Sequence, residues 1–105
     1  MLGDLEQLVM LAVMRIGDGA YGVRIGEELA RHGGRDLTFA TIHKVLERLE
    51  DKGFVRSELG DPTPVRGGRA KRYFTVTAQG RRVLKHELAI IRNMAAGLNL
   101  GWDPA

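Results

Sequence analysis

The sequence predicts a mainly α-helical domain with a small two-stranded antiparallel β-hairpin. Apolar residues recur at helical spacing in four segments, and glycine or threonine residues mark the ends of those segments. Two short β-prone runs lie between the third and the fourth segment. A chain of 105 residues can bury one hydrophobic core but has no room for a separate catalytic domain.

The composition excludes some classes of protein. The chain has no cysteine, so it forms neither disulfides nor thiolate metal sites, in agreement with a reducing cytoplasm. Its apolar runs are too short to span a membrane, and we expect no signal peptide. The net charge of +3 is uneven, because the first 53 residues carry −2 and the other 52 carry +5. This local basic excess favours a polyanionic partner.

The first predicted helix begins at Asp4, an N-cap candidate, and ends before Gly17. Its apolar residues at positions 5, 8, 9, 12, 13 and 16 follow the helical period. Met10 and Met14 add apolar surface outside this stripe. A terminal helix of a small domain should keep a solvated side, so we expect a second subunit to cover part of this helix.

Two further helices are predicted over residues 22–31 and 39–52. The motif His32-Gly33-Gly34 ends the second helix, since glycine readily adopts the left-handed conformation that follows a helix. Thr38 is the N-cap candidate of the third helix, and Gly53 ends it. The inward-facing residues of the third helix are expected to be Ile42, Val45, Leu46 and Leu49.

The two β-prone runs, residues 54–59 and 73–77, predict a hairpin whose loop covers about residues 60–71. The end of this loop is basic. Residues 66–73 include four cations and two glycines, and they contain no acid. A flexible basic loop between two strands is suited to contact a phosphate backbone.

A fourth helix is predicted over residues 78–98, with Thr77 as its N-cap candidate and an apolar seam at positions 84, 88, 91, 95 and 98. The order helix, helix, helix, strand, loop, strand, helix is that of a winged helix-turn-helix, in which the hairpin loop is the wing. We therefore assign residues 1–77 to this domain and residues 78–98 to a dimerisation helix continuous with it. Residues 99–105 form a short tail.

In a helix-turn-helix, the first residues of the third helix meet the edges of bases in DNA. The candidates for contacts with bases are Ala40, Thr41, His43 and Lys44. The candidates for contacts with phosphates are Thr38, Arg48, Arg66, Arg69, Lys71 and Arg72. Glu47, Glu50 and Asp51 favour a solvated face, without DNA contact, for the C-terminal half of the helix.

Catalysis and metal binding find little support in the residue pattern. The three histidines are far apart in sequence, and no two of them are spaced as i and i+4. Neither of the glycine motifs that bind phosphates of nucleotides occurs. We therefore expect neither an enzyme nor a bound metal or cofactor.

Several segments, in this order, resemble PadR-type transcriptional regulators. They are LGDLEQLVMLAV (residues 2–13), AYGV (20–23), VLERLEDKGFV (45–55), RGGRAKRYF (66–74) and TAQGR (77–81). The resemblance implies a cytoplasmic regulator of bacteria or archaea, usually a repressor, that binds double-stranded DNA as a homodimer. The chain departs from the family at His43, where relatives commonly have a tyrosine that faces phosphates. Protonated imidazole can donate to a phosphate, so we expect DNA affinity to rise at mildly acidic pH.

In this family the C-terminal helix forms the dimer with help from the first helix. The dimer-interface candidates are therefore Leu5, Met10, Met14, Leu84, Leu88, Ile91, Met94, Ala95 and Leu98. The single C-terminal helix resembles the short-tailed group of the family. Some relatives hold flat aromatic ligands at the dimer interface, and Trp102 is the candidate contact for a small aromatic effector.

Two other functions fit parts of the sequence. Winged helices also serve as protein-interaction or dimerisation modules without nucleic acid, and the acidic end of the third helix agrees with that alternative. The motif Arg66-Gly67-Gly68-Arg69 suggests RNA binding, although no aromatic residues for base stacking are interleaved with it.

Overall fold

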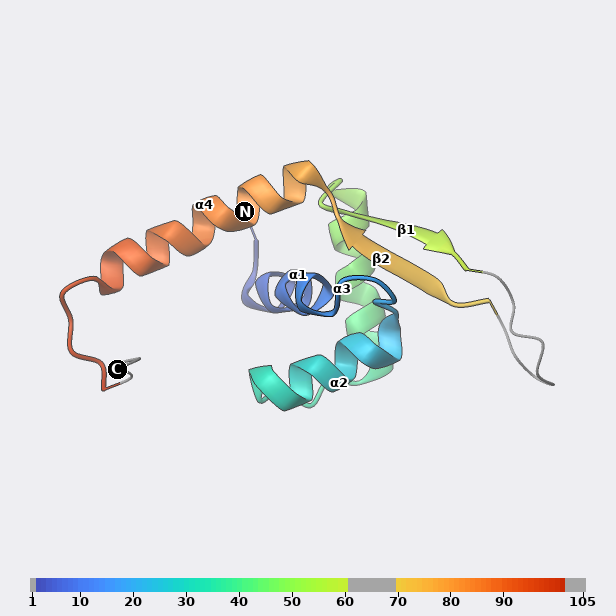
Figure 1. Cartoon of the computed structure of the whole chain (residues 1–105), viewed down its shortest axis with the longest axis horizontal. Coiled ribbons are helices and arrows are strands. Elements are labelled where there is room, and N and C mark those ends of the chain that lie inside the picture. The colour runs from blue at the N-terminus through green and yellow to red at the C-terminus, as the bar shows by residue number, and fades with distance from the viewer. Residues whose placement is uncertain (1, 61–69, 102–105) are drawn as a thin grey trace.

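The computed structural model describes residues 2–60 and 70–101, and it has the predicted mainly α-helical fold with a β-hairpin (Figure 1). The elements follow one another as α1 (Asp4–Ile16), α2 (Gly22–Gly33), α3 (Phe39–Asp51), β1 (Val55–Leu59), β2 (Arg72–Val76) and α4 (Ala78–Ala95). The helices α1, α2 and α3 form a compact body. The hairpin and α4 project from this body in opposite directions, which gives a molecule 55 Å long and 26 Å by 22 Å across.

The hydrophobic core lies between the three helices of the body and the start of the hairpin. The predicted inward face of α3 is confirmed, because all four of its expected core residues are buried. The largest side chains that are completely buried are Met10, Ile25, Leu46, Leu49, Val9 and Val55. Burial of such side chains is worth roughly 1.5–3 kcal/mol each, so this cluster stabilises the arrangement of α2 and α3 on α1.

The ends of the helices follow from local chemistry, with two corrections to the expected boundaries. Helix α1 has Gly3 rather than Asp4 as its N-cap, and the Glu6 carboxylate accepts a hydrogen bond of 2.8 Å from the Gly3 N–H. Helix α2 ends as predicted at a glycine, since Gly34 has a left-handed φ of 63°. Helix α4 ends at Ala95, so Leu98 lies beyond the helix and not within it.

The strands β1 and β2 pair antiparallel, with Val55 opposite Val76 and Leu59 opposite Arg72. The Phe74 N–H donates to the Ala20 carbonyl at 2.8 Å, which fastens β2 to the segment between α1 and α2. Phe74 and Val76 are buried, because alternate residues of β2 face the core. Most of the predicted wing, including residues 61–69, lies outside the described residues.

Helix α4 is joined to the body by a group of hydrogen bonds around Thr77. Its hydroxyl donates to the Gly53 carbonyl at 2.7 Å and accepts from the Gly80 N–H at 3.0 Å, which makes Thr77 the predicted N-cap. Its backbone N–H donates to the Phe54 carbonyl at 3.0 Å. Gly80 packs so closely on this carbonyl that a β-carbon at residue 80 would lie 2.1 Å from the oxygen. The first turn of α4 therefore requires glycine.

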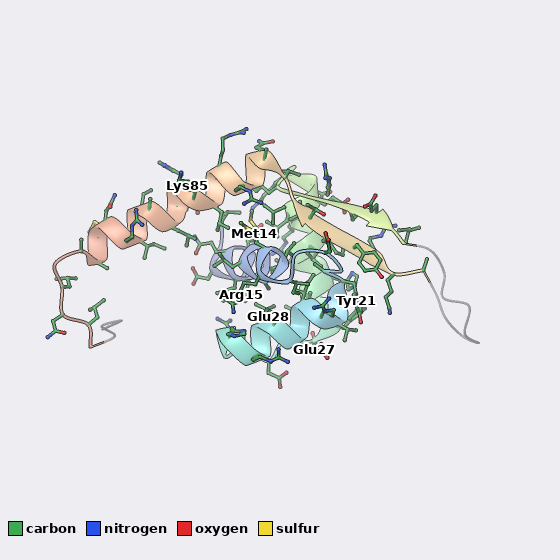
Figure 2. All side chains as sticks on the ribbon, viewed as in Figure 1. Met14, Arg15, Tyr21, Glu27, Glu28 and Lys85 are labelled. Carbon is green, nitrogen blue, oxygen red and sulfur yellow. The ribbon has the colours of Figure 1, made fainter. Side chains whose placement is uncertain are left out.

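Carboxylates connect α1 to the other helices. The Lys52 ammonium donates to both Glu6 oxygens, at 2.9 and 2.7 Å. Burial alone raises the pKa of Glu6, but the Gly3 N–H and the cations Lys52 and Arg48 outweigh it, so the pKa lies below its usual value of 4.5. The Glu28 carboxylate on α2 likewise accepts from Arg15 of α1 at 3.2 Å (Figure 2).

Candidate nucleic-acid interface

The first turn of α3 is held in place by its N-cap. The Thr38 hydroxyl oxygen accepts from the Thr41 N–H at 3.1 Å, and the hydroxyl donates to the Thr41 Oγ1 at 2.9 Å. These bonds satisfy a backbone donor that the helix itself leaves without a partner. The Thr41 hydroxyl hydrogen is not used in them, so it is available to donate to an acceptor outside the chain.

The candidates for contacts with bases lie along one side of α3. Ala40 and Lys44 are exposed, whereas Thr41 and His43 are half-buried at the edges of the same surface. Glu47 and Asp51 continue the exposed side toward the C-terminal end of the helix. The side chains on this surface are therefore small or basic toward the N-terminal end of α3 and acidic toward its C-terminal end, as the helical periodicity predicts.

Phe39, the first residue of α3, was not among the expected functional residues. Its side chain is 60% exposed, and its ring packs against the His43 imidazole with a centroid distance of 4.2 Å. Both rings also touch Gly22 at the start of α2. A β-carbon at residue 22 would lie 2.9 Å from Phe39 Cε1 and 3.2 Å from His43 Nε2. The N-terminal ends of α2 and α3 thus meet at a glycine.

The loop end of strand β2 adjoins the same end of α2. Tyr21 lies at the N-terminal end of α2, on the side of the body from which the hairpin projects (Figure 2). Its ring meets the Tyr73 ring edge to face, with centroids 5.9 Å apart, and the Lys71 ammonium lies 4.7 Å from the Tyr21 centroid. The consecutive residues Tyr21 and Gly22 therefore contact the loop end of the hairpin and the first turn of α3, respectively.

The other cationic candidates differ in position. Arg72 donates to the Ser57 hydroxyl at 3.0 Å across the hairpin, and that hydroxyl donates to Glu50 at 2.7 Å. Arg48 is exposed, but it lines a cleft with Glu6 and Lys52 at the N-terminal end of α1, well away from the first turn of α3. Arg66 and Arg69 lie outside the described residues.

The apolar surface expected at a dimer interface is present on α4, but two of the residues expected to line the interface do not lie on a surface. Met10 and Leu84 are 0% and 3% exposed, so they belong to the core of this chain and cannot line a surface for a second copy. Met10 points inward because α1 is covered on several sides by its own chain. The exposed members of the expected interface are Ile91, Met94 and Leu98, and the half-buried ones are Leu5, Met14, Leu88 and Ala95.

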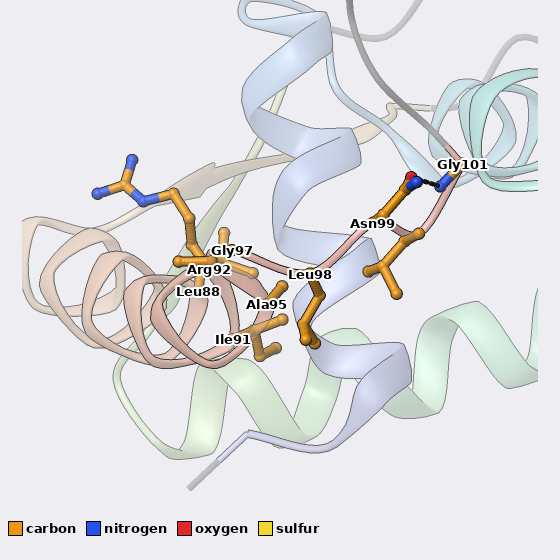
Figure 3. A pocket seen from close by; sticks show the side chains of 10 residues that line it. Leu88, Ile91, Arg92, Ala95, Gly97, Leu98, Asn99 and Gly101 are labelled. Carbon is orange, nitrogen blue, oxygen red and sulfur yellow. Dashed lines mark hydrogen bonds between the residues drawn. The ribbon is translucent and has the colours of Figure 1, made fainter.

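Near the C-terminal end of α4, the chain turns back and encloses an apolar cleft (Figure 3). Leu88, Ile91 and Ala95 line it from the helix, and Leu98 and Leu100 from the segment that follows. A second apolar groove runs between α1 and α4, where Met14 lies beneath Lys85 (Figure 2). Trp102, the candidate effector contact, is outside the described residues.

Within residues 2–60 and 70–101, no group of three or more histidine, aspartate or glutamate side chains could hold a metal ion. In the same part of the chain, no helix has the length and apolar character needed to cross a membrane.

Comparisons with known proteins place these features in context. The family model described as "Transcriptional regulator PadR-like family" matches residues 10–86. A PadR-like transcription factor from Bacteroides fragilis has a TM-score of 0.73 and 22% identity, over 86% of this chain and 82% of that one. A PadR family transcriptional regulator from Eggerthella lenta has a TM-score of 0.69 and 29% identity, over 90% and 81%.

The chain is also similar to Bacillus subtilis PadR in complex with operator DNA, with a TM-score of 0.65 and 19% identity. That similarity covers 81% of this chain and 46% of the longer relative. The search of curated proteins gave no significant match.

Proposed function

Because the chain belongs to the PadR-like family of transcriptional regulators, we propose that it binds DNA sequence-specifically, acts in the cytoplasm as a homodimeric repressor, and has no enzymatic activity. One observation supports this most directly. Tyr21 and Gly22 bring the basic end of the hairpin and the exposed first turn of α3 to one end of the molecule. A winged helix needs this arrangement to place a helix in the major groove while the wing contacts the adjacent backbone.

The proposed contacts divide into two groups. Ala40, Thr41, His43 and Lys44 meet base edges, because they surround the exposed first turns of α3. The Thr38, Arg48, Lys71 and Arg72 side chains are assigned to phosphates, together with Arg66 and Arg69 of the wing. Lys71 stands out among them, since the ring of Tyr21 holds its ammonium next to α2.

A second copy of the chain is the proposed partner of the α4 surface. Ile91, Met94 and Leu98 are each more than half exposed at the C-terminal end of α4, and neighbouring exposed apolar side chains favour an interaction surface. Two copies joined through α4 would present two α3 helices to half-sites about one helical turn, roughly 34–36 Å, apart. We also propose that this interface binds a small aromatic effector, with Trp102 as the candidate contact.

The similarity to Bacillus subtilis PadR supports the choice of partner, because that relative was solved with operator DNA. The most direct test is footprinting of the full chain on the DNA upstream of its own gene, where small repressors often bind. A protected region with two similar half-sites is the expected result. Absence of any protection at low salt would contradict the proposal.

Salt dependence then tests the two groups of contacts separately. Lys71→Ala should weaken binding about equally for all sequences and flatten the salt slope by about one unit, because one phosphate contact is lost. Lys44→Ala should instead change which sequences are preferred. Lys85→Ala is the matched control, since it removes the same charge from α4 (Figure 2). Equal salt slopes for Lys71→Ala and Lys85→Ala would contradict the assignment of Lys71.

The alternative is a protein-interaction module that does not bind nucleic acid. The exposed acids Glu47 and Asp51 on α3 are the observation that favours it. The two functions differ in a simple measurement. A chain that forms a stable dimer but fails to bind any duplex DNA at low salt would fit the interaction module.

A further inference from the structure

Phe39 has an unusual combination of properties for an aromatic residue. It is 60% exposed, yet it is the first residue of α3 and its ring is held on one side by His43 and Gly22. Exposed aromatic side chains that are held rigidly lose little entropy on binding, which makes them effective contact residues. The side chains that precede and follow it in this turn are the N-cap Thr38 and the small Ala40, so the outer side of the ring is open.

We propose that Phe39 contacts the 5-methyl group of a thymine in the major groove and thereby sets part of the sequence preference; this rests on the proposed DNA-binding function. A phenyl ring cannot donate or accept a conventional hydrogen bond. The only strongly apolar group that base pairs present in the major groove is the thymine methyl. Insertion between base pairs is typical of proteins in the minor groove, and stacking on free bases requires a single strand. The thymine methyl is therefore the partner that this position favours.

The electrostatics of the first turn agree with this partner. The first turn of α3 contains no acid, so the ring can approach the duplex without repulsion from its neighbours. The ring carries no charge and releases no counterions from DNA. Its contribution should consequently change sequence preference without changing the salt slope, unlike that of Lys71.

The role of Gly22 follows from the same geometry. Any β-carbon at residue 22 would lie 2.9 Å from Phe39 Cε1, so the ring would have to rotate away. Gly22→Ala should therefore displace the ring without removing it. In the proposed mechanism, Gly22→Ala and Phe39→Ala impair the same base preference.

The test begins with selection of duplexes by the full chain from a random-sequence library. Each conserved thymine in the selected site is then replaced, one at a time, by deoxyuridine, which lacks only the 5-methyl group. At one position per half-site, this change should weaken binding by the wild type about fourfold, the effect of one buried methyl group. Phe39→Ala should bind the thymine site more weakly and no longer distinguish thymine from deoxyuridine there, with an unchanged salt slope.

Two further variants make the result specific. Phe39→Leu keeps an apolar side chain and should retain part of the discrimination, whereas Lys44→Ala should retain all of it. Because Phe39 is largely exposed, circular dichroism of Phe39→Ala should match that of the wild type. Discrimination by Phe39→Ala equal to that of the wild type would overturn the role of Phe39 and leave the proposed DNA-binding function intact. Failure of the wild type to select any duplex would overturn both.

Discussion

Replacing Gly80 by alanine tests how α4 is attached to the body. An alanine β-carbon would lie 2.1 Å from the Phe54 oxygen and 2.9 Å from the Phe54 carbonyl carbon. Ordinary contacts between a carbon and a carbonyl oxygen are about 3.3–3.6 Å, so the first turn of α4 must move away by roughly 1 Å. The obstructing atoms belong to the Phe54 backbone, so they cannot move aside by a change of side-chain rotamer. The movement stretches the bond from the Thr77 N–H to Phe54 and the bond from the Thr77 hydroxyl to Gly53.

The magnitude follows from three contributions. Overpacking in a close contact costs about 1–3 kcal/mol, and each weakened hydrogen bond costs up to roughly 1 kcal/mol. Alanine is favoured over glycine in a helix by at most about 1 kcal/mol, which offsets part of the cost. We therefore expect Gly80→Ala to lower the free energy of unfolding by about 2–3 kcal/mol. For a domain of this size, that corresponds to a fall in Tm of about 10–20 °C.

The assay is thermal unfolding followed by circular dichroism at one fixed protein concentration, because dimerisation would make Tm depend on concentration. Gly33→Ala is the matched control. Residue 33 is also helical, but a β-carbon there would make its closest contact with Leu29 Cδ2 at 3.9 Å, so we expect a gain of up to about 1 kcal/mol. The two substitutions should thus act in opposite directions. A Tm for Gly80→Ala equal to or above that of the wild type would refute the reasoning.

Three other outcomes are expected. Glu6→Gln should destabilise the fold by about 1 kcal/mol near neutral pH, allowing for the partial exposure of Lys52. Because the pKa of Glu6 is lowered in the fold, this loss of stability should disappear as the pH falls below 4.5 and through the folded pKa. Urea titrations of both proteins at several pH values measure the difference. Ile91→Asp should convert a dimer into a monomer in sedimentation experiments, whereas His86→Asp, also exposed on α4 but off the seam, should not. His43→Ala should weaken DNA binding, because an imidazole N–H can donate to DNA; equal binding isotherms for wild type and variant at one pH would contradict a role for the imidazole.

The sequence was sufficient to predict the helices and the buried face of α3, because a regular period of apolar residues determines which side of a helix can be buried. Helix α1 has such a period as well, but Met10 and Met14 add apolar residues outside it. It is apolar on several sides, so the pattern could not show whether Met10 faces the core of its own chain or a second copy. In the structure, Met10 is completely buried and faces the core of its own chain. Leu84 was misplaced for a related reason, since the start of the seam on α4 packs on the body.

Phe39 and Gly80 could not be recognised from local sequence at all. The exposure of Phe39 depends on the position of the α2 N-terminus, where Gly22 lets one edge of the ring approach another helix closely. The need for glycine at residue 80 arises from the Phe54 carbonyl, 26 positions earlier in the chain. Both depend on contacts between elements that are separate in sequence, and such contacts leave no periodic trace.

Helix α4 is attached to the body at two places along its length. One is the junction of Thr77 and Gly80 with the end of α3 and the start of β1. The other is Glu87, which is buried and accepts from the Leu2 N–H at 3.1 Å and from the Gln7 side chain at 3.3 Å. At 1.5 Å per residue, the ten residues from Thr77 to Glu87 separate these attachments by about 15 Å along the helix. Two attachments that far apart restrain rotation of α4 about either one of them. In the proposed homodimer, these two attachments would set the distance between the two α3 helices, and a fixed half-site spacing requires such a defined distance.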